Sequence, residues 1–177
     1  MTYVEEGNYK TRNAAITSIC TLLRITTKLE FFDDLLSKII SMSFSPKSYH
    51  RINFIQFLKT GINYFSNSLY NNQFVKLYIK LLLDKNPIIS QKAIDLSPQI
   101  ALKLKSQYKE SRESIIKSIE MSQIDLTIKT KALNAIHNLD DSFIPNLIYL
   151  EDESEKKLLE HEQSLQASIK PINVIMN

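Results

Sequence analysis

The sequence predicts an all-α protein, an α-solenoid in which about four helix pairs stack into a right-handed superhelix. Two observations support this. Apolar residues recur at spacings of three and four, as on one face of a helix, and the whole pattern repeats every 39 residues. A third observation argues against other folds. The 177 residues include two glycines, too few for a many-stranded barrel or for a glycine-rich phosphate loop.

The repeat is clearest in a helix that recurs four times, over about 8–25, 47–65, 87–105 and 125–139. A polar residue begins each copy, and small or apolar residues follow three, four, seven and ten positions later. The aligned sets are Arg12, Arg51, Ser90 and Lys129; Ala15, Phe54, Ala93 and Ala132; Ile16, Ile55, Ile94 and Leu133; Ile19, Leu58, Ser97 and Ile136; and Leu22, Gly61, Ile100 and Leu139. These offsets place the apolar side chains on one helical face.

A second set of apolar stripes predicts helices over about 29–43, 69–84, 107–121 and 142–151. The turns that join the two helices of a pair contain Pro46 and Pro87, which suit the first turn of the following helix. One helix pair cannot bury its apolar face alone, so neighbouring pairs must stack. We expect residues 1–151 to form this solenoid and residues 152–177 to form an acidic helical extension or tail. The alternative is a compact helix bundle with a chance periodicity.

Aromatic residues divide into two expected groups. We expect Phe31, Phe32, Phe74 and Tyr78, which belong to apolar stripes, to lie mostly in the core. Tyr49, Tyr64 and Tyr70 lie nearer to turns, where exposed aromatic side chains can anchor a partner.

The charge distribution favours protein partners over nucleic acid. Residues 1–150 carry a net charge of +6 and residues 151–177 a net charge of −3. The total of +3 is too mild to indicate nucleic-acid binding. A single cysteine, Cys20, and the lack of an apolar run of about 20 residues predict a cytoplasmic or nuclear protein without a membrane span.

No pattern of residues predicts an enzyme, a metal site or a cofactor. The histidines His50, His137 and His161 lie far apart, and Cys20 lies among apolar positions, as a buried thiol would. Paired acids at 33–34 and 140–141 precede or begin predicted helices, where carboxylates favour the positive end of the helix dipole.

Several of these features resemble the HEAT repeat, an armadillo-like helical repeat. The resemblance covers about 8–151 and rests on the period, on Asp84 and Pro87 in a turn, and on the basic residues that begin three of the four copies; Ser90 departs from it. A narrower resemblance is to the scaffold subunit of type-2A serine/threonine protein phosphatases and to the related regulatory subunit of type-4 phosphatases. Residues 8–16, 30–36, 41–46 and 49–52, together with Pro98, carry it.

This resemblance implies a scaffold that holds a phosphatase catalytic subunit on the turns inside the helix pairs. Stacking would align the basic residues of these turns along one edge, which suits an acidic protein surface. The expected partner contacts are Lys47, Tyr49, His50, Arg51, Lys85 and Asn86, with Arg51 partly structural. Alternatives are a HEAT module of a nuclear-transport or chromosome-associated complex, a helical-repeat nucleic-acid binder, or a turn edge that meets only solvent.

Overall fold

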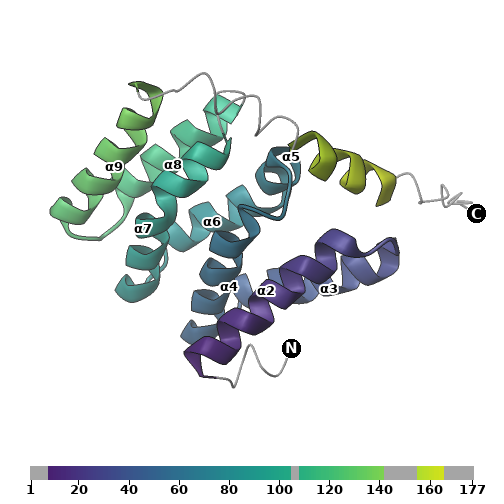
Figure 1. The fold of residues 1–177 in the computed structure, drawn as a ribbon. Coiled ribbons are helices and arrows are strands. Elements are labelled where there is room, and N and C mark those ends of the chain that lie inside the picture. The colour runs from purple at the N-terminus through teal and green to yellow at the C-terminus, as the bar shows by residue number, and fades with distance from the viewer. Residues whose placement is uncertain (1–7, 105–107, 142–154, 166–177) are drawn as a thin grey trace, which may run out of the picture.

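The computed structural model describes residues 8–104, 108–141 and 155–165, and the regular elements within these ranges are all helices (Figure 1). The all-α prediction is therefore confirmed. The helices are α2 (Tyr9–Ile25), α3 (Leu29–Ser43), α4 (Ser48–Gly61), α5 (Asn67–Leu69), the π-helical turn η1 (Tyr70–Phe74), α6 (Val75–Leu82), α7 (Pro87–Leu104), α8 (Lys109–Met121) and α9 (Leu126–Asp141). Residues 155–165 are also helical. The helix predicted over 142–151 lies outside the described residues.

The helices pack in chain order. α2 packs against α4, α4 against α7, and α7 against α9, so the four copies of the repeated helix form one row (Figure 1). Each intervening helix packs against the copy that follows it, since α3 contacts α4, α6 contacts α7, and α8 contacts α9. α6 also contacts α8 behind this row. No helix in the described parts of the chain is long and apolar enough to cross a membrane.

The core lies where the aligned apolar sets predicted it. Ile16, Ile55 and Ile94 are buried at equivalent positions of α2, α4 and α7. Leu22 is an exception, because 44% of its surface is exposed while the adjacent Leu23 is fully buried. Within the described residues no helix precedes α2, and the face that carries Leu22 therefore lacks the cover that later copies receive.

Two small residues in apolar sets are explained by their neighbours. A Cβ atom on Gly61 would lie 2.8 Å from Cε2 of Phe65, so only glycine leaves room for that ring. Ser97 is buried because its hydroxyl lies 2.6 Å from the hydroxyl of Tyr78, which also donates to the carbonyl of Ala93 at 2.7 Å. The small side chain permits close packing in the first case and satisfies a buried tyrosine in the second.

Three sequence-based expectations are wrong in detail. Phe31 is 46% exposed, and only Phe32 of this pair faces the core. Tyr70 is fully buried and donates to the carbonyl of Leu58, so it cannot anchor a partner. The acids at 33–34 lie in the second turn of α3 rather than at its start, and Asp34 pairs with Lys38 at 2.6 Å on the surface.

Candidate partner-binding surface

The turns that join the two helices of each pair share one hydrogen-bond pattern. In each of them a side-chain oxygen accepts from the backbone N–H two residues later, as in an Asx or Ser/Thr turn. The three bonds are Ser45 Oγ with Lys47 N at 3.3 Å, Asp84 Oδ1 with Asn86 N at 2.8 Å, and Asp125 Oδ1 with Thr127 N at 2.8 Å. The internal repeat therefore extends to the local structure of the turns.

The residue that begins each repeated helix also has a shared role. Arg51 Nη1 donates to the carbonyl of Ser45 at 2.6 Å, Ser90 Oγ to that of Leu82 at 2.5 Å, and Lys129 Nζ to that of Glu120 at 3.0 Å. Each bond ties the second helix of a pair to the end of the first helix or to the turn. Ser90, which departs from the basic pattern, is thus a shorter donor in the same role.

Arg51 additionally links two consecutive turns. Its Nε donates to Asp84 Oδ2 at 2.7 Å and its Nη2 to Asp84 Oδ1 at 3.2 Å, which is a bidentate ion pair. The side chains are only 17% and 11% exposed. The guanidinium also donates to the carbonyl of Pro46 at 3.1 Å. These bonds fix the turn at 44–47 relative to the turn at 83–86 and give Arg51 a structural role.

The other predicted contact residues lie on these two linked turns. Lys47 and Lys85 are exposed, and Tyr49 is 42% exposed. His50 is half-buried, with Nδ1 2.7 Å from Ser45 Oγ, and its ring meets the Tyr49 ring edge-on. Asn86 is half-buried, and its Oδ1 accepts from the backbone N–H two residues later at 3.0 Å. The structure therefore places the six residues on neighbouring turns and gives half of them local structural bonds.

The sequence analysis missed exposed apolar side chains that flank each turn. Residues five positions apart, one before and one after the turn, are exposed in all three pairs. They are Phe44 and Tyr49, Leu83 and Ile88, and Met121 and Leu126, with exposed fractions between 42% and 75%. The first two pairs are 39 residues apart, so the period could have revealed them. Each turn thus presents apolar surface beside its lysines, as protein interfaces commonly do.

A cation also covers one of these apolar side chains. Lys80 Nζ lies 4.1 Å from the centre of the Phe44 ring. This contact holds a positive charge over the flank of the first turn. Together, the side chains of the two linked turns form what we call the turn edge: Phe44, Lys47, Tyr49, Leu83, Lys85 and Ile88.

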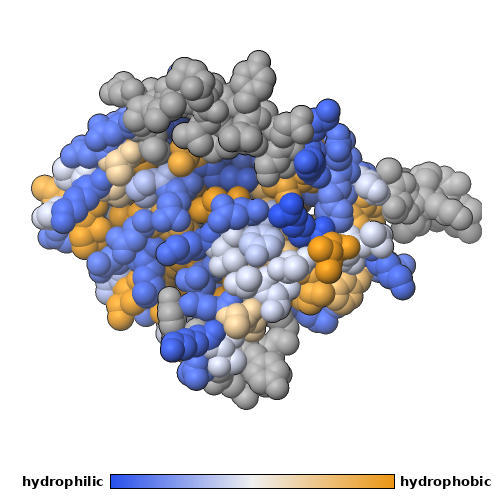
Figure 2. Space-filling model, viewed as in Figure 1, coloured by the Kyte–Doolittle hydropathy of each residue, from blue (hydrophilic) through white to orange (hydrophobic). Residues whose placement is uncertain are grey.

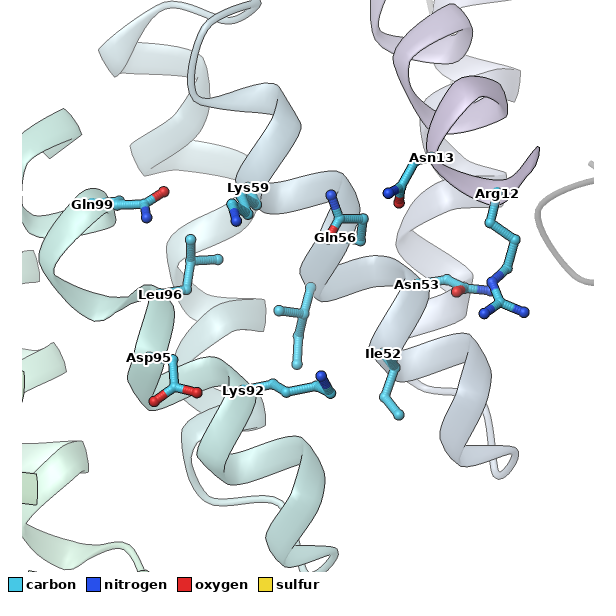
Figure 3. A pocket seen from close by; sticks show the side chains of 11 residues that line it. Arg12, Asn13, Ile52, Asn53, Gln56, Lys59, Lys92, Asp95, Leu96 and Gln99 are labelled. Carbon is cyan, nitrogen blue, oxygen red and sulfur yellow. The ribbon is translucent and has the colours of Figure 1, made fainter. Parts of the chain in front are cut away.

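A separate hollow of about 460 Å³ crosses the row formed by α2, α4 and α7 (Figure 3). Arg12, Lys59 and Lys92 line it together with Asp95, and Lys92 extends from α7 toward α4. Amide side chains such as Gln56 complete a mostly polar wall. Within the described residues no group of His, Cys, Asp and Glu side chains could hold a metal ion.

The face that carries this row is mixed in polarity. Figure 2 shows apolar side chains in separate patches among hydrophilic ones on this face. The mixture gives the hollow no feature of a catalytic site. We therefore regard the turn edge as the stronger candidate surface.

Comparisons with known proteins add no further constraint. No family model, curated protein or solved structure matches the chain.

Proposed function

We propose that this chain is a protein-binding scaffold, an α-solenoid of about four HEAT-like helix pairs. Its proposed role is that of a regulatory or scaffold component of a type-2A-like serine/threonine phosphatase complex in the cytoplasm or nucleus. In this role the chain contributes no chemistry of its own. It holds a catalytic subunit close to its substrates, so that its effect arises from proximity.

The helix order supports the solenoid. The repeated helices pack each on the next, and the same turn bond recurs in three consecutive pairs. A chance periodicity in a compact bundle has no reason to reproduce these bonds at equivalent positions.

The turn edge is the observation that carries the binding role. Its lysines and apolar side chains recur with the period of the fold, while the Arg51–Asp84 pair fixes the two turns beneath them. A surface that is already ordered loses little conformational entropy when a partner binds. Its charge favours an acidic surface with apolar patches.

The phosphatase assignment rests on the sequence resemblance of residues 8–16 and 30–36, which lie at the start of α2 and across α3. A nuclear-transport or chromosome-associated partner would use the same kind of edge, so the identity of the bound protein separates these hypotheses. Nucleic-acid binding is disfavoured by the net charge of +3.

Affinity purification of the tagged chain from its own cells, with mass spectrometry of the bound proteins, tests the proposal. We expect a phosphatase catalytic subunit with the wild-type chain and its loss from Lys47→Glu/Lys85→Glu. The matched control is Lys76→Glu/Lys117→Glu, which reverses two exposed charges on α6 and α8 and should retain the partner. A small GTPase or a chromatin subunit in place of the phosphatase would overturn the assignment.

A further inference from the structure

The helix at 155–165 docks on the body through one regularly spaced face. Glu155, Leu158, Glu162 and Leu165 follow one another at intervals of three, four and three residues, a spacing that places them on one side of a helix. This helix lies beside the start of α5 (Figure 1). Its sequence is distant from that of the surface it covers, since 88 to 96 positions separate the bonded residues.

The two carboxylates bind the backbone where α5 begins. Glu162 Oε1 accepts from the backbone N–H of Ser66 at 2.8 Å, and its Oε2 accepts from the Ser66 hydroxyl. Glu155 Oε1 accepts from the backbone N–H of Asn67, and its Oε2 lies 3.5 Å from Lys103 Nζ. Backbone N–H groups at a helix start have no partner within the helix, and they favour negative charge.

Two leucines support these polar contacts. Leu158 is 6% exposed and Leu165 is 3% exposed, and Leu165 belongs to the main hydrophobic cluster. The opposite side of the helix, which includes Lys156 and Lys157, is exposed. The contact therefore has the form of an amphipathic helix in an acceptor site.

The acceptor site is polar at its centre, which makes its occupant exchangeable. Burial raises the pKa of Glu162 more than the bonds from Ser66 lower it, and repulsion from Glu155 raises it further. Holding this carboxylate in its charged form thus costs free energy. A helix held in this way is bound more weakly than a helix with a purely apolar face of the same area.

We infer that the surface around Ser66, Asn67 and Lys103 is a docking site for acidic amphipathic helices and that residues 155–165 are its tethered occupant. The partner is a protein helix with the spacing Glu-x2-Leu-x3-Glu-x2-Leu, which binds by displacing the chain's own helix. This inference goes beyond the proposed scaffold role and does not depend on it. Because a tethered occupant acts at an effective concentration in the millimolar range, only a strong or abundant partner helix displaces it.

The first test frees the site without altering it. In the full chain, Glu155→Lys/Glu162→Lys reverses the two carboxylates of the occupant and leaves Ser66, Asn67 and Lys103 unchanged. The probe is a fluorescein-labelled peptide with the native sequence of residues 152–168, and its binding is followed by fluorescence anisotropy. We expect at least tenfold tighter binding to this variant than to the wild-type chain, where the site is filled.

Matched variants separate docking from general charge effects. Lys156→Glu/Lys157→Glu changes two exposed charges on the same helix and should bind the peptide as weakly as the wild type. Addition of Lys103→Glu to the freed chain should weaken peptide binding at least fivefold, because it replaces the cation that faces Glu155. Failure of the peptide to bind a freed chain with wild-type circular dichroism, or binding that is indifferent to Lys103→Glu, overturns the inference.

Hydrogen exchange on the wild-type chain gives a second test that needs no variant. We expect the backbone amides of residues 159–165 to exchange at least tenfold faster than those of residues 93–101 in α7, because the docked helix opens without unfolding the core. Equal protection of the two segments would make residues 155–165 an integral part of the core and overturn the inference.

Discussion

The bidentate pair between Arg51 and Asp84 should be a principal stabilising link between consecutive helix pairs. Arg51→Met keeps the aliphatic part of the side chain and removes the guanidinium, while Asp84→Asn keeps an acceptor for the backbone of Asn86. Loss of one partner from a buried ion pair costs about 3–5 kcal/mol. The side chains here are 17% and 11% exposed, so we expect a smaller loss of about 2–3 kcal/mol for Arg51→Met.

A double-mutant cycle isolates the pair itself. Urea unfolding followed by far-UV circular dichroism gives the free energy of unfolding of the wild type, both single variants and the double variant. We expect a coupling energy of about 1–2 kcal/mol, within the range for residues in direct contact. The control is the cycle for Asp34 and Lys38, which are equally close at 2.6 Å but 62% and 56% exposed. It should couple by about 0.3–0.5 kcal/mol. Equal coupling in the two cycles would refute the reasoning.

Three further predictions concern single positions. Gly61→Ala should lower the free energy of unfolding by about 1–3 kcal/mol, because its Cβ would lie 2.8 Å from the Phe65 ring; an unchanged urea midpoint would contradict this. Burial raises the pKa of the Cys20 thiol to about 12, so a thiol reagent at pH 8 should react only after unfolding; rapid modification of the native chain would count against it. Burial also raises the pKa of Glu162 above its ordinary value of 4.5, so the docking that this group favours is fully present below pH 4.5 and is lost as the pH rises through the raised value. Glu162→Gln should remove that part of the pH dependence of hydrogen exchange at residues 159–165, and a profile identical to that of the wild type would show that another group titrates.

The sequence predicted the helices well because two periodicities agree. Within each copy a period of 3.6 residues marks the buried face, and the 39-residue period repeats that face. Ile55 and Ile94 are therefore buried at the expected places. The same reasoning could not decide between Phe31 and Phe32, since both belong to one apolar stripe and only the position of α4 decides which ring it covers.

The roles of polar residues were harder to predict from sequence alone. Ser90 and Ser97 interrupt the expected patterns because their partners, Leu82 and Tyr78, lie on a different helix. The acidic region after residue 151 was expected to be an extension or tail, and its charge gives no sign of where a helix docks. The spacing of Glu155 and Glu162 was visible, but their binding partners depend on how the chain returns to the start of α5.

Of the surface expected to bind a partner, the lysines could be located because they follow the turns. The structural duties of Arg51 and Asn86 emerge only when the bonds of the turns are known. The apolar side chains beside the lysines, such as Phe44 and Leu83, were missed because exposed apolar residues cannot be distinguished from core residues by composition.

Direct binding between the purified chain and a purified type-2A phosphatase catalytic subunit, measured by isothermal titration calorimetry, tests the central claim. The account predicts a stoichiometric complex with the wild-type chain and with Lys76→Glu/Lys117→Glu. It also predicts at least tenfold weaker binding by Lys47→Glu/Lys85→Glu, whose melting temperature should match that of the wild type. Binding that is equally strong with all three proteins, or absent with the folded wild-type chain, would contradict it.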